Sequence, residues 1–319
     1  MLTRSLILKG SALGPVQRLI RESRMFRPLV RRFIAGDTLD DAMSASRELL
    51  SRNFAVSLDY LGENTKTEAE ALKVAATFIT MLNRIAQEDV YKASEANAYR
   101  RGAVENLNIS IKMTQCGLDQ GDEFAEKNYR DVMKVAQSQG NFVRVDMEAS
   151  EYTDRTIKMV DRVYKDFSNT GTVLQSYLYR TPEDLEWAIE KGIRIRLVKG
   201  AYLESAKVAF KEKSKVDEAY VRLAKRMLDA GNYPALATQD EEIVKELNKY
   251  VAEMKIDKKT FEYQMLYGIR RDLQDSLLRD GYNVRIYVPF GDSWYPYFTR
   301  RLAERPANSL FILKSLFKG

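Results

Sequence analysis

The chain has 319 residues, 45% of them hydrophobic, which is enough to bury a large core. No uninterrupted apolar run approaches the ~20 residues of a membrane-spanning helix, and one cysteine, Cys116, leaves no intramolecular disulfide. Histidine is absent, which excludes mechanisms with an imidazole base, such as Ser-His-Asp and Cys-His catalysis. The commonest transition-metal ligand is therefore missing, and we expect no metal site.

The net charge of +6 is concentrated at the beginning of the chain. Residues 1–35 hold eight Lys and Arg but a single acid, Glu22, whereas the remainder has one more acid than base. The body of the protein is therefore not basic, and we expect no nucleic-acid partner.

The basic segment VQRLIRESRMFRPLVRRFIAG (16–36) has the pattern of an amphipathic helix, interrupted near Pro28. It either lies on an anionic membrane surface or forms helices packed on the domain, and the second interpretation is favoured. A signal peptide is disfavoured because the apolar run SLIL is short and Lys9 interrupts it. We predict an N-terminal helical segment over residues 1–50 of a cytoplasmic protein, with peripheral contact at the inner face of the membrane as the alternative.

After residue 50, short β-rich runs alternate with longer helical patterns. The predicted strands are 54–60, 107–113, 142–148, 172–178, 193–199, 234–238, 260–265 and 283–289. Several carry polar residues at alternate positions, so apolar packing alone does not bury both faces.

The predicted helices are 67–87, 122–140, 153–167, 181–192, 214–231, 240–254, 268–281 and one over 295–309. A Thr/Asp pair at residue 153 is expected to open its helix, and Thr181 is expected to cap the next, with Pro182 in the first turn. Gly140 and Gly192 are expected to end their helices.

Eight strand–helix units in sequence predict an α/β fold, a (βα)₈ TIM-type barrel over residues 51–319, with an N-terminal helical extension and a C-terminal helix. A doubly wound open sheet is the alternative. No G-x-G-x-x-G follows the first strand, which argues against a dinucleotide-binding domain of that kind. In a barrel the active site lies at the C-terminal ends of the strands.

The strand ends therefore supply the candidate site residues. They are Glu63, Lys112, Asp146, Glu148, Gln175, Tyr177, Arg196, Lys199, Thr238, Gln239, Gln264 and Tyr287. Each alone is compatible with a surface charge or a structural ion pair, but a polar barrel mouth with both signs suits a large polar ligand such as a nucleotide cofactor. Lys112 and Lys199 also leave open a Schiff-base lyase.

The last helical pattern, YPYFTRRLAERPANS (295–309), places Tyr297, Arg300, Arg301 and Glu304 on one side. This face is either solvated or brings two arginines together on an anion.

Three blocks, RIRLVKGAY (194–202), FEYQMLYGI (261–269) and RIYVPFGDSWYPYFTRRLAERPAN (285–308), resemble the signature blocks of proline dehydrogenases. LGENT (61–65), ISIKMTQCG (109–117), VRVDMEAS (143–150) and LQSYLYR (174–180) match in order. The resemblance, over residues 50–312, implies a monofunctional bacterial enzyme with non-covalent FAD. It would oxidise L-proline to Δ1-pyrroline-5-carboxylate by hydride transfer to the flavin and pass electrons to a quinone-type acceptor.

The resemblance also implies residue roles. The substrate carboxylate would bind Arg300, Arg301 and Lys112, with Tyr287 and Leu266 on the proline ring, Asp146 orienting, and Glu63 closing the site on Arg300. Arg196, Lys112 and Tyr202 would be the catalytic set. The flavin would contact Gln175, Arg196, Lys199, Gly200, Ala201, Tyr202, Thr238, Gln239, Gln264 and Glu304.

Gln239 departs from the family pattern, which usually has histidine there. Glutamine donates a hydrogen bond but carries no positive charge, so we expect cofactor binding to survive with an altered affinity or potential. Beside the dehydrogenase and the lyase, a barrel that has lost its flavin through this change is the third hypothesis.

Overall fold

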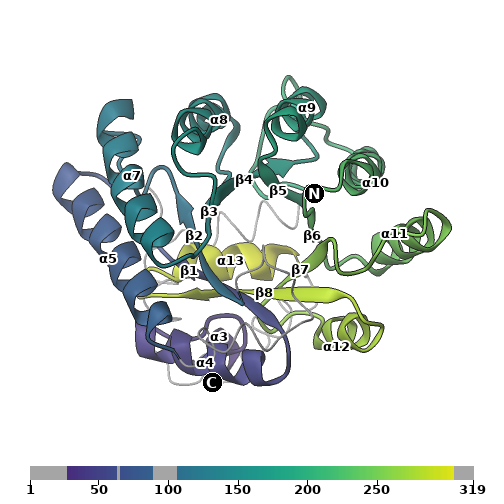
Figure 1. Cartoon of the computed structure of the whole chain (residues 1–319), viewed down its shortest axis with the longest axis horizontal. Helices are drawn as coiled ribbons and strands as arrows, with labels where there is room; N and C mark the ends of the chain where they lie inside the picture. Colours follow the sequence, from purple (N-terminus) through teal and green to yellow (C-terminus); the bar gives the residue numbers. More distant parts are fainter. Residues whose placement is uncertain (1–26, 63–64, 89–105, 305–319) are drawn as a thin grey trace, which may run out of the picture.

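A computed structural model describes residues 27–62, 65–88 and 106–304. Its centre is a closed barrel of eight parallel strands in chain order, so the predicted barrel is confirmed and the open sheet is wrong (Figure 1). The strands are β1 (Ala55–Tyr60), β2 (Leu107–Lys112), β3 (Val143–Asp146), β4 (Thr170–Gln175), β5 (Arg194–Val198), β6 (Ala235–Ala237), β7 (Glu262–Leu266) and β8 (Asn283–Phe290). All eight predicted strands are present. Glu148, Tyr177 and Lys199 fall just beyond strand ends rather than within strands.

The barrel closes because β1 pairs with both β2 and β8, with Val56 opposite Leu107 on one side and Ile286 on the other. Residues alternate between the two faces of each strand. The outward face is apolar and belongs to the main hydrophobic core. The inward face carries polar side chains. Arg196 of β5, for example, donates to the Ser110 hydroxyl of β2 inside the barrel. This arrangement explains the alternate polar positions seen in the sequence.

Most helices lie outside the barrel, each between two successive strands. The helices are α3 (Arg27–Arg31), α4 (Leu39–Ser51), α5 (Glu68–Ala86), α7 (Asp122–Ser138), α8 (Ser150–Tyr164), α9 (Thr181–Lys191), α10 (Lys213–Ala230), α11 (Glu241–Glu253), α12 (Arg271–Arg279) and α13 (Tyr295–Glu304). Gly140 follows α7 and Gly192 ends α9, both with positive φ as predicted.

Two predicted caps are wrong. Helix α8 begins at Ser150 instead of Thr153, which is buried, and the Ser150 amide donates to the Glu204 carboxylate at 2.7 Å. Thr181 is the first residue of α9, not its cap, because its hydroxyl donates to the Gln175 carbonyl at 2.6 Å. The contact at α8 comes from a segment distant in the chain, whereas the contact of Thr181 is with a carbonyl six residues earlier.

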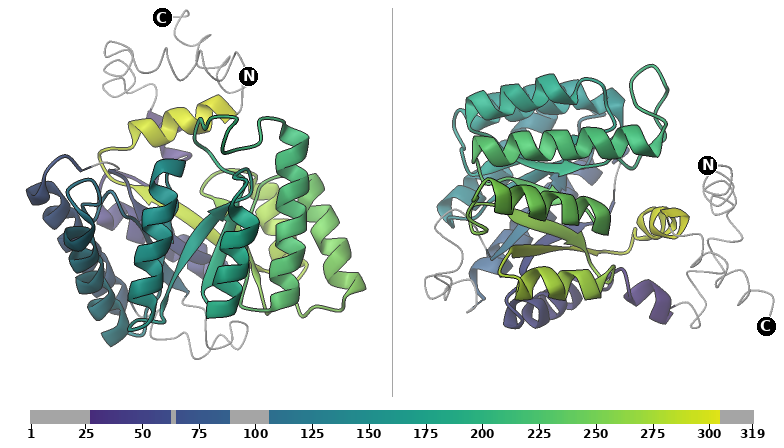
Figure 2. Two further views of the ribbon diagram at one scale, coloured as in Figure 1. Left: turned by 90° about the horizontal axis from the view of Figure 1, so that it is seen from above. Right: turned by 90° about the vertical axis from the view of Figure 1, so that its right-hand side faces the viewer.

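Two helices depart from the regular order. Helix α4, capped by Thr38 with Asp41 in a capping box, packs against β1 and β8 on the outside of the barrel. Helix α13 follows β8 but lies across one end of the barrel (Figure 2). A division of the chain at residue 50 stays a prediction; α4 ends one residue later.

Helix α3 and the residues that follow it pack against α13 in a second, smaller core. Phe33 and Ile34 pack there with Tyr295, Tyr297 and Phe298, and the Phe33 and Phe298 rings are 6.3 Å apart. This cluster fixes α13 over the barrel mouth. The predicted N-terminal segment is described only from residue 27, and residues 1–26 lie outside the described part.

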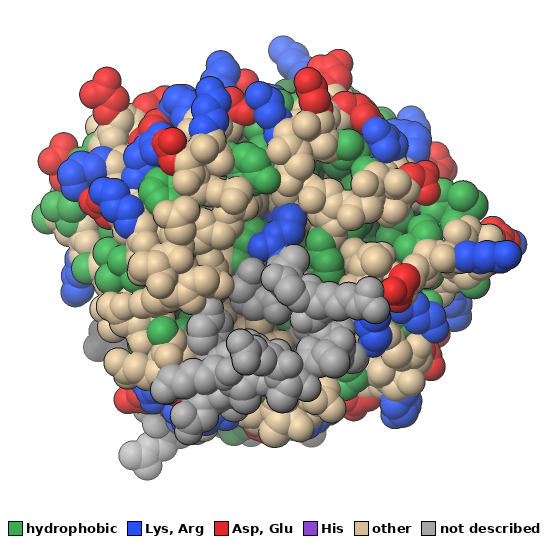
Figure 3. All heavy atoms as spheres, viewed as in Figure 1, with side chains coloured by type: hydrophobic (Ala, Val, Ile, Leu, Met, Phe, Trp, Pro, Cys, Tyr) green, Lys and Arg blue, Asp and Glu red, His purple; other side chains and the backbone are tan. Residues whose placement is uncertain are grey.

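The face in Figure 3 mixes acidic and basic side chains over the outer helices. Among the described helices, none combines the length and apolar character needed to cross a bilayer. Cys116 is buried, and burial raises the pKa of its thiol.

Candidate active site

A cavity of about 1020 Å³, counting the open space at its mouth, lies at the C-terminal ends of the strands. It brings together predicted site residues from six strands, from the loops after β5 and β6, and from α13. Those lining it are Lys112, Asp146, Gln175, Arg196, Gly200, Ala201, Tyr202, Gln239, Gln264, Leu266, Tyr287, Arg300 and Arg301. Of the residues predicted from strand ends, Glu148, Tyr177, Lys199 and Thr238 do not line this cavity.

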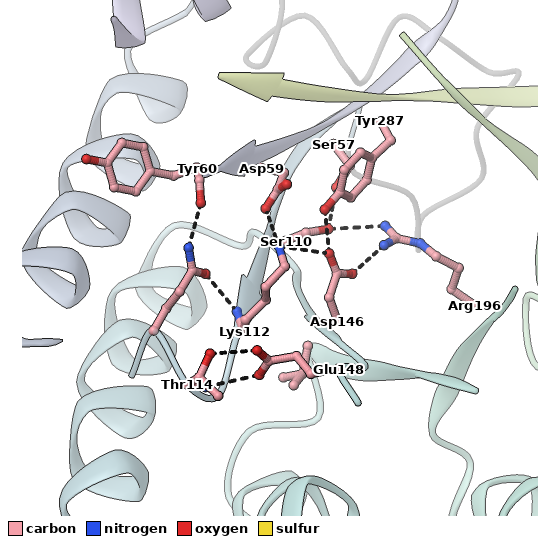
Figure 4. A network of polar contacts seen from close by, with 12 residues as sticks. Ser57, Asp59, Tyr60, Ser110, Lys112, Thr114, Asp146, Glu148, Arg196 and Tyr287 are labelled. Carbon is pink, nitrogen blue, oxygen red and sulfur yellow. Dashed lines mark hydrogen bonds and ion pairs between the residues drawn. The ribbon is translucent and has the colours of Figure 1, made fainter. Parts of the chain in front are cut away.

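A buried network of charged groups forms one wall of the cavity (Figure 4). The Lys112 ammonium lies 2.7 Å from Asp59 and 3.8 Å from Asp146. Asp146 also accepts from the Arg196 guanidinium at 2.5 Å and from the Tyr287 hydroxyl at 2.6 Å. All five are buried or nearly so, and two cations balance two carboxylates. A balanced group of this kind tolerates burial, whereas removing one member would leave an uncompensated charge.

Burial governs ionisation within this network. Burial raises the pKa of Asp59, the charge of Asp146 raises it further, and Lys112 opposes both. Burial also raises the pKa of Tyr287, and the neighbouring carboxylates Asp146 and Asp59 add to that rise. Tyr287 is therefore a neutral phenol at physiological pH and a hydrogen-bond donor to Asp146.

A second buried ion pair, Glu262–Arg285, holds Arg196 in place through Gln264. The Arg196 Nε donates to Gln264, whose amide donates in turn to Glu262. Glu262 accepts from Arg285 at 2.8 Å, and Arg285 also donates to the Val56 carbonyl at 2.9 Å. Burial would raise the pKa of Glu262, but Arg285 outweighs it and the pKa is lowered. The guanidinium of Arg196 is thus held by neighbours on three other strands.

The opposite wall comes from the ends of β4 and β5. The Gln175 amide donates to the Glu148 carbonyl at 3.2 Å, and its buried Oε1 has no hydrogen-bond partner in the described structure. Gly200 has φ +113°, and a Cβ there would lie 2.4 Å from the Tyr177 ring. Glycine is required at this turn, which carries Ala201 and Tyr202 to the cavity edge.

Two predicted cofactor contacts lie beside the cavity instead of lining it. Lys199 is paired with Asp217 at 2.5 Å and with Asp240 at 2.8 Å. The Thr238 hydroxyl accepts from the Asp240 amide at 3.1 Å and shapes the turn into α11. Burial would raise the pKa of Asp240, but Lys199 and Lys213 lower it to about 2. Gln239, between these residues in sequence, does line the cavity.

Helix α13 supplies the cationic rim. Arg300 and Arg301 are half-buried and both line the cavity. The Arg301 guanidinium lies 5.2 Å from the centre of the Tyr297 ring, so these two residues share a helix face as predicted. The solvated-face alternative does not describe this pair. Glu63 and the side chain of Glu304 lie outside the described residues, so their roles stay predictions.

Asp59 is a charged cavity residue that sequence reasoning missed. It lines the cavity and is 1% exposed. Ser57 and Asp59 stand two apart in β1, so both point inward, and this polar alternation was the available signal. For this part of the barrel the predicted site residue was Glu63, which lies beyond the strand end.

A TIM-type barrel whose C-terminal mouth holds a cavity lined by an arginine pair and a buried Lys–Asp network has the architecture of a barrel enzyme. The sequence profile described as proline dehydrogenase matches residues 42–314. Proline dehydrogenase 1 of Bacillus subtilis subsp. natto is 40% identical over 288 residues, 90% of each chain. Proline dehydrogenase of Deinococcus radiodurans is 38% identical over 321 residues, 100% of this chain and 99% of the relative.

The chain therefore belongs to the proline dehydrogenase family, and it is an oxidoreductase of proline catabolism. Its similarity to the monofunctional bacterial relatives extends over nearly their whole length. Proline utilization A from Bdellovibrio bacteriovorus has the same fold, with a TM-score of 0.80 and 24% identity over 94% of this chain and 36% of that one.

Proposed function

We propose that this enzyme oxidises L-proline to Δ1-pyrroline-5-carboxylate with non-covalently bound FAD and passes the electrons to a quinone-type acceptor. The observation that carries the proposal is that Lys112 of β2 and Arg300 and Arg301 of α13 line the same cavity. Guanidinium forks bind a carboxylate in two-point contact, and a cavity poor in water strengthens that contact.

The remaining substrate roles follow from the walls around these cations. Tyr287 and Leu266 border the same space and would pack against the proline ring. Asp146 accepts from Tyr287 and Arg196 and lies near Lys112, so its proposed role is to orient these three groups. Tyr202 stands at the edge where substrate and cofactor would meet.

The residues present fit a flavin. The Gln175 Oε1 is a buried acceptor without a partner in the described structure, as a ligand bearing an N–H donor would require. Arg196, Gly200, Ala201, Gln239 and Gln264 line the same space and would hold the cofactor. When bound, FAD would accept the hydride from C5 of proline. Arg196 would supply a fixed positive charge at the reacting end of the cavity.

The protonation state of the proline amine would set a condition for the reaction. Proline must lose its amine proton before hydride loss, and none of the described carboxylates near Lys112 needs to act as the base, because water can take that proton. Lys199 and Thr238 remain proposed cofactor contacts, although Lys199 is already engaged by Asp217 and Asp240.

The lyase alternative is not favoured by the environment of Lys112. A Schiff-base lysine must react as a neutral amine. The Lys112 ammonium is buried 2.7 Å from Asp59, and this pairing favours its charged form. Borohydride trapping with a carbonyl compound should therefore leave Lys112 and Lys199 unmodified.

The test is spectroscopic. Purified protein should carry a visible flavin absorbance that bleaches under anaerobic conditions when L-proline is added, and a quinone should restore it. The D-enantiomer serves as the matched control. Protein that is folded but cannot be reconstituted with FAD would overturn the cofactor proposal and favour a barrel that has lost its flavin through Gln239. Bleaching without reoxidation by quinones would overturn the acceptor alone.

A further inference from the structure

Asp59 has no place in the proposed chemistry, yet it lies inside the cavity wall. Its carboxylate is 1% exposed and is 2.7 Å from the Lys112 ammonium. The same ammonium is 3.8 Å from Asp146. One buried cation is thus shared by two carboxylates before any ligand arrives (Figure 4).

A ligand carboxylate at Lys112 would be a third anion around that ammonium. Two cations, Lys112 and Arg196, balance Asp59 and Asp146 in the buried network. Arg300 and Arg301 add charge from the rim, but they are only half-buried, so water screens their charge more than it screens that of Lys112. Anions that share one buried cation raise each other's pKa, and the least stabilised of them takes up a proton.

We infer that Asp59 takes up one proton from solvent when a carboxylate ligand binds Lys112, so that the neutral acid yields the ammonium to the ligand. The inference rests on the proposed carboxylate site. The proton comes from water or buffer and ends on the Asp59 carboxyl group, and no other bond changes. Binding of the substrate carboxylate is thereby coupled to pH.

Asp59 is the group to expect in this role because, among the described groups that face it, Lys112 is the one cation, and that is the cation the ligand would engage. Asp146 has a second cation beside it, because it accepts from the Arg196 guanidinium at 2.5 Å. The Tyr287 hydroxyl donates to Asp146 at 2.6 Å, and its hydrogen bonding also acts to lower the pKa of Asp59. The charged or titratable groups facing Asp59 are Lys112 of β2, Asp146 of β3 and Tyr287 of β8. Lys112 alone among these three carries a positive charge. Burial and Asp146 already raise the pKa of Asp59 in the unliganded structure, in support of this choice.

The experiment is calorimetric titration of the holoenzyme with tetrahydrofuran-2-carboxylate. This probe keeps the ring and carboxylate of proline but has an ether oxygen in place of the amine, so it contributes no amine proton. Titrations in two buffers of different ionisation enthalpy, from about pH 6 to about pH 9, give the protons taken up per ligand bound. We expect net uptake that approaches one proton, and a Kd that rises by up to about tenfold per pH unit where uptake is largest.

Asp59→Asn keeps the size of the side chain and cannot take up the proton. It should bind the probe with no net uptake and a Kd that no longer depends on pH over this range. Glu148→Gln is the matched control: Glu148 is 3% exposed, accepts from Thr114, and does not line the cavity. This control should keep the proton uptake of the wild type.

Uptake that persists in Asp59→Asn would overturn the assignment to Asp59. Binding to the wild type without net uptake would overturn the coupling, and this measurement decides the matter even if Asp59→Asn does not fold. If the wild type holds flavin but does not bind the probe, the proposed carboxylate site itself fails, and the inference fails with it.

Discussion

Replacing Arg301 by methionine tests the proposed carboxylate site most directly. Arg301 is half-buried, lines the cavity and packs against Tyr297 at 5.2 Å. Methionine keeps an apolar stem against that ring but removes the charge and the guanidinium fork. Helix α13 should therefore keep its position on the barrel mouth, and the substrate should lose one anionic contact.

The expected size follows from the burial of this residue. A hydrogen bond to a charged group stabilises a complex by about 1.5–3 kcal/mol. Because Arg301 is only half-buried, water screens the contact and the lower end applies, about 1.5–2 kcal/mol. The KM for L-proline should rise by about 10- to 30-fold, since about 1.4 kcal/mol is a factor of ten. The kcat should change much less, because the carboxylate contact is the same in ground state and transition state.

Steady-state kinetics with a dye acceptor gives both constants, and visible absorbance gives the flavin content of the same samples. Arg301→Lys is the matched control, because it keeps the charge without the fork and should raise KM only a few-fold. A KM that is unchanged in Arg301→Met at full flavin content would show that this arginine does not contact the substrate. Loss of flavin in step with activity would point to a cofactor role instead.

Three further outcomes are expected. Asp240→Asn keeps the cap of α11 but removes the charge paired with Lys199. Because the pKa of Asp240 is lowered to about 2, its charge stabilises the fold at neutral pH, and this stabilisation is lost between about pH 4 and about pH 2. The unfolding free energy of the variant should therefore not show that loss on acidification. Glu262→Gln deprives buried Arg285 of its carboxylate and should cost about 3–5 kcal/mol in urea unfolding, whereas a loss below 1 kcal/mol would contradict the buried ion pair. Cys116, whose thiol pKa is raised by burial, should react with iodoacetamide only after denaturation, and rapid alkylation of native protein would contradict its placement.

The sequence alone predicted the repeating strand–helix order and therefore the barrel. Strand and helix periodicities are local, and each element between residues 54 and 290 could be recognised from its own residues. The C-terminal-rim rule then indicated part of the cavity lining without any distance information, because in a parallel barrel the strand ends meet at one rim. It missed Asp59, and it included Glu148, Tyr177, Lys199 and Thr238, which do not line the cavity. The glycines that follow α7 and α9 could also be predicted, because the left-handed backbone conformation that favours glycine at a helix end is a local feature.

The tertiary structure decided what depends on segments distant in the chain. Glu204 binds the first amide of α8 from 54 residues away, and Asp59 reaches Lys112 across 53 residues. A side chain's own neighbours in sequence carry no record of such partners. Helix α4 likewise packs on β1 and β8, the first and last strands of the barrel, and Phe33 contacts Phe298 of α13 from the other end of the chain. Strand periodicity thus predicted which residues face the interior of the barrel. Their charges and protonation depend on burial and on partners that only folding brings together.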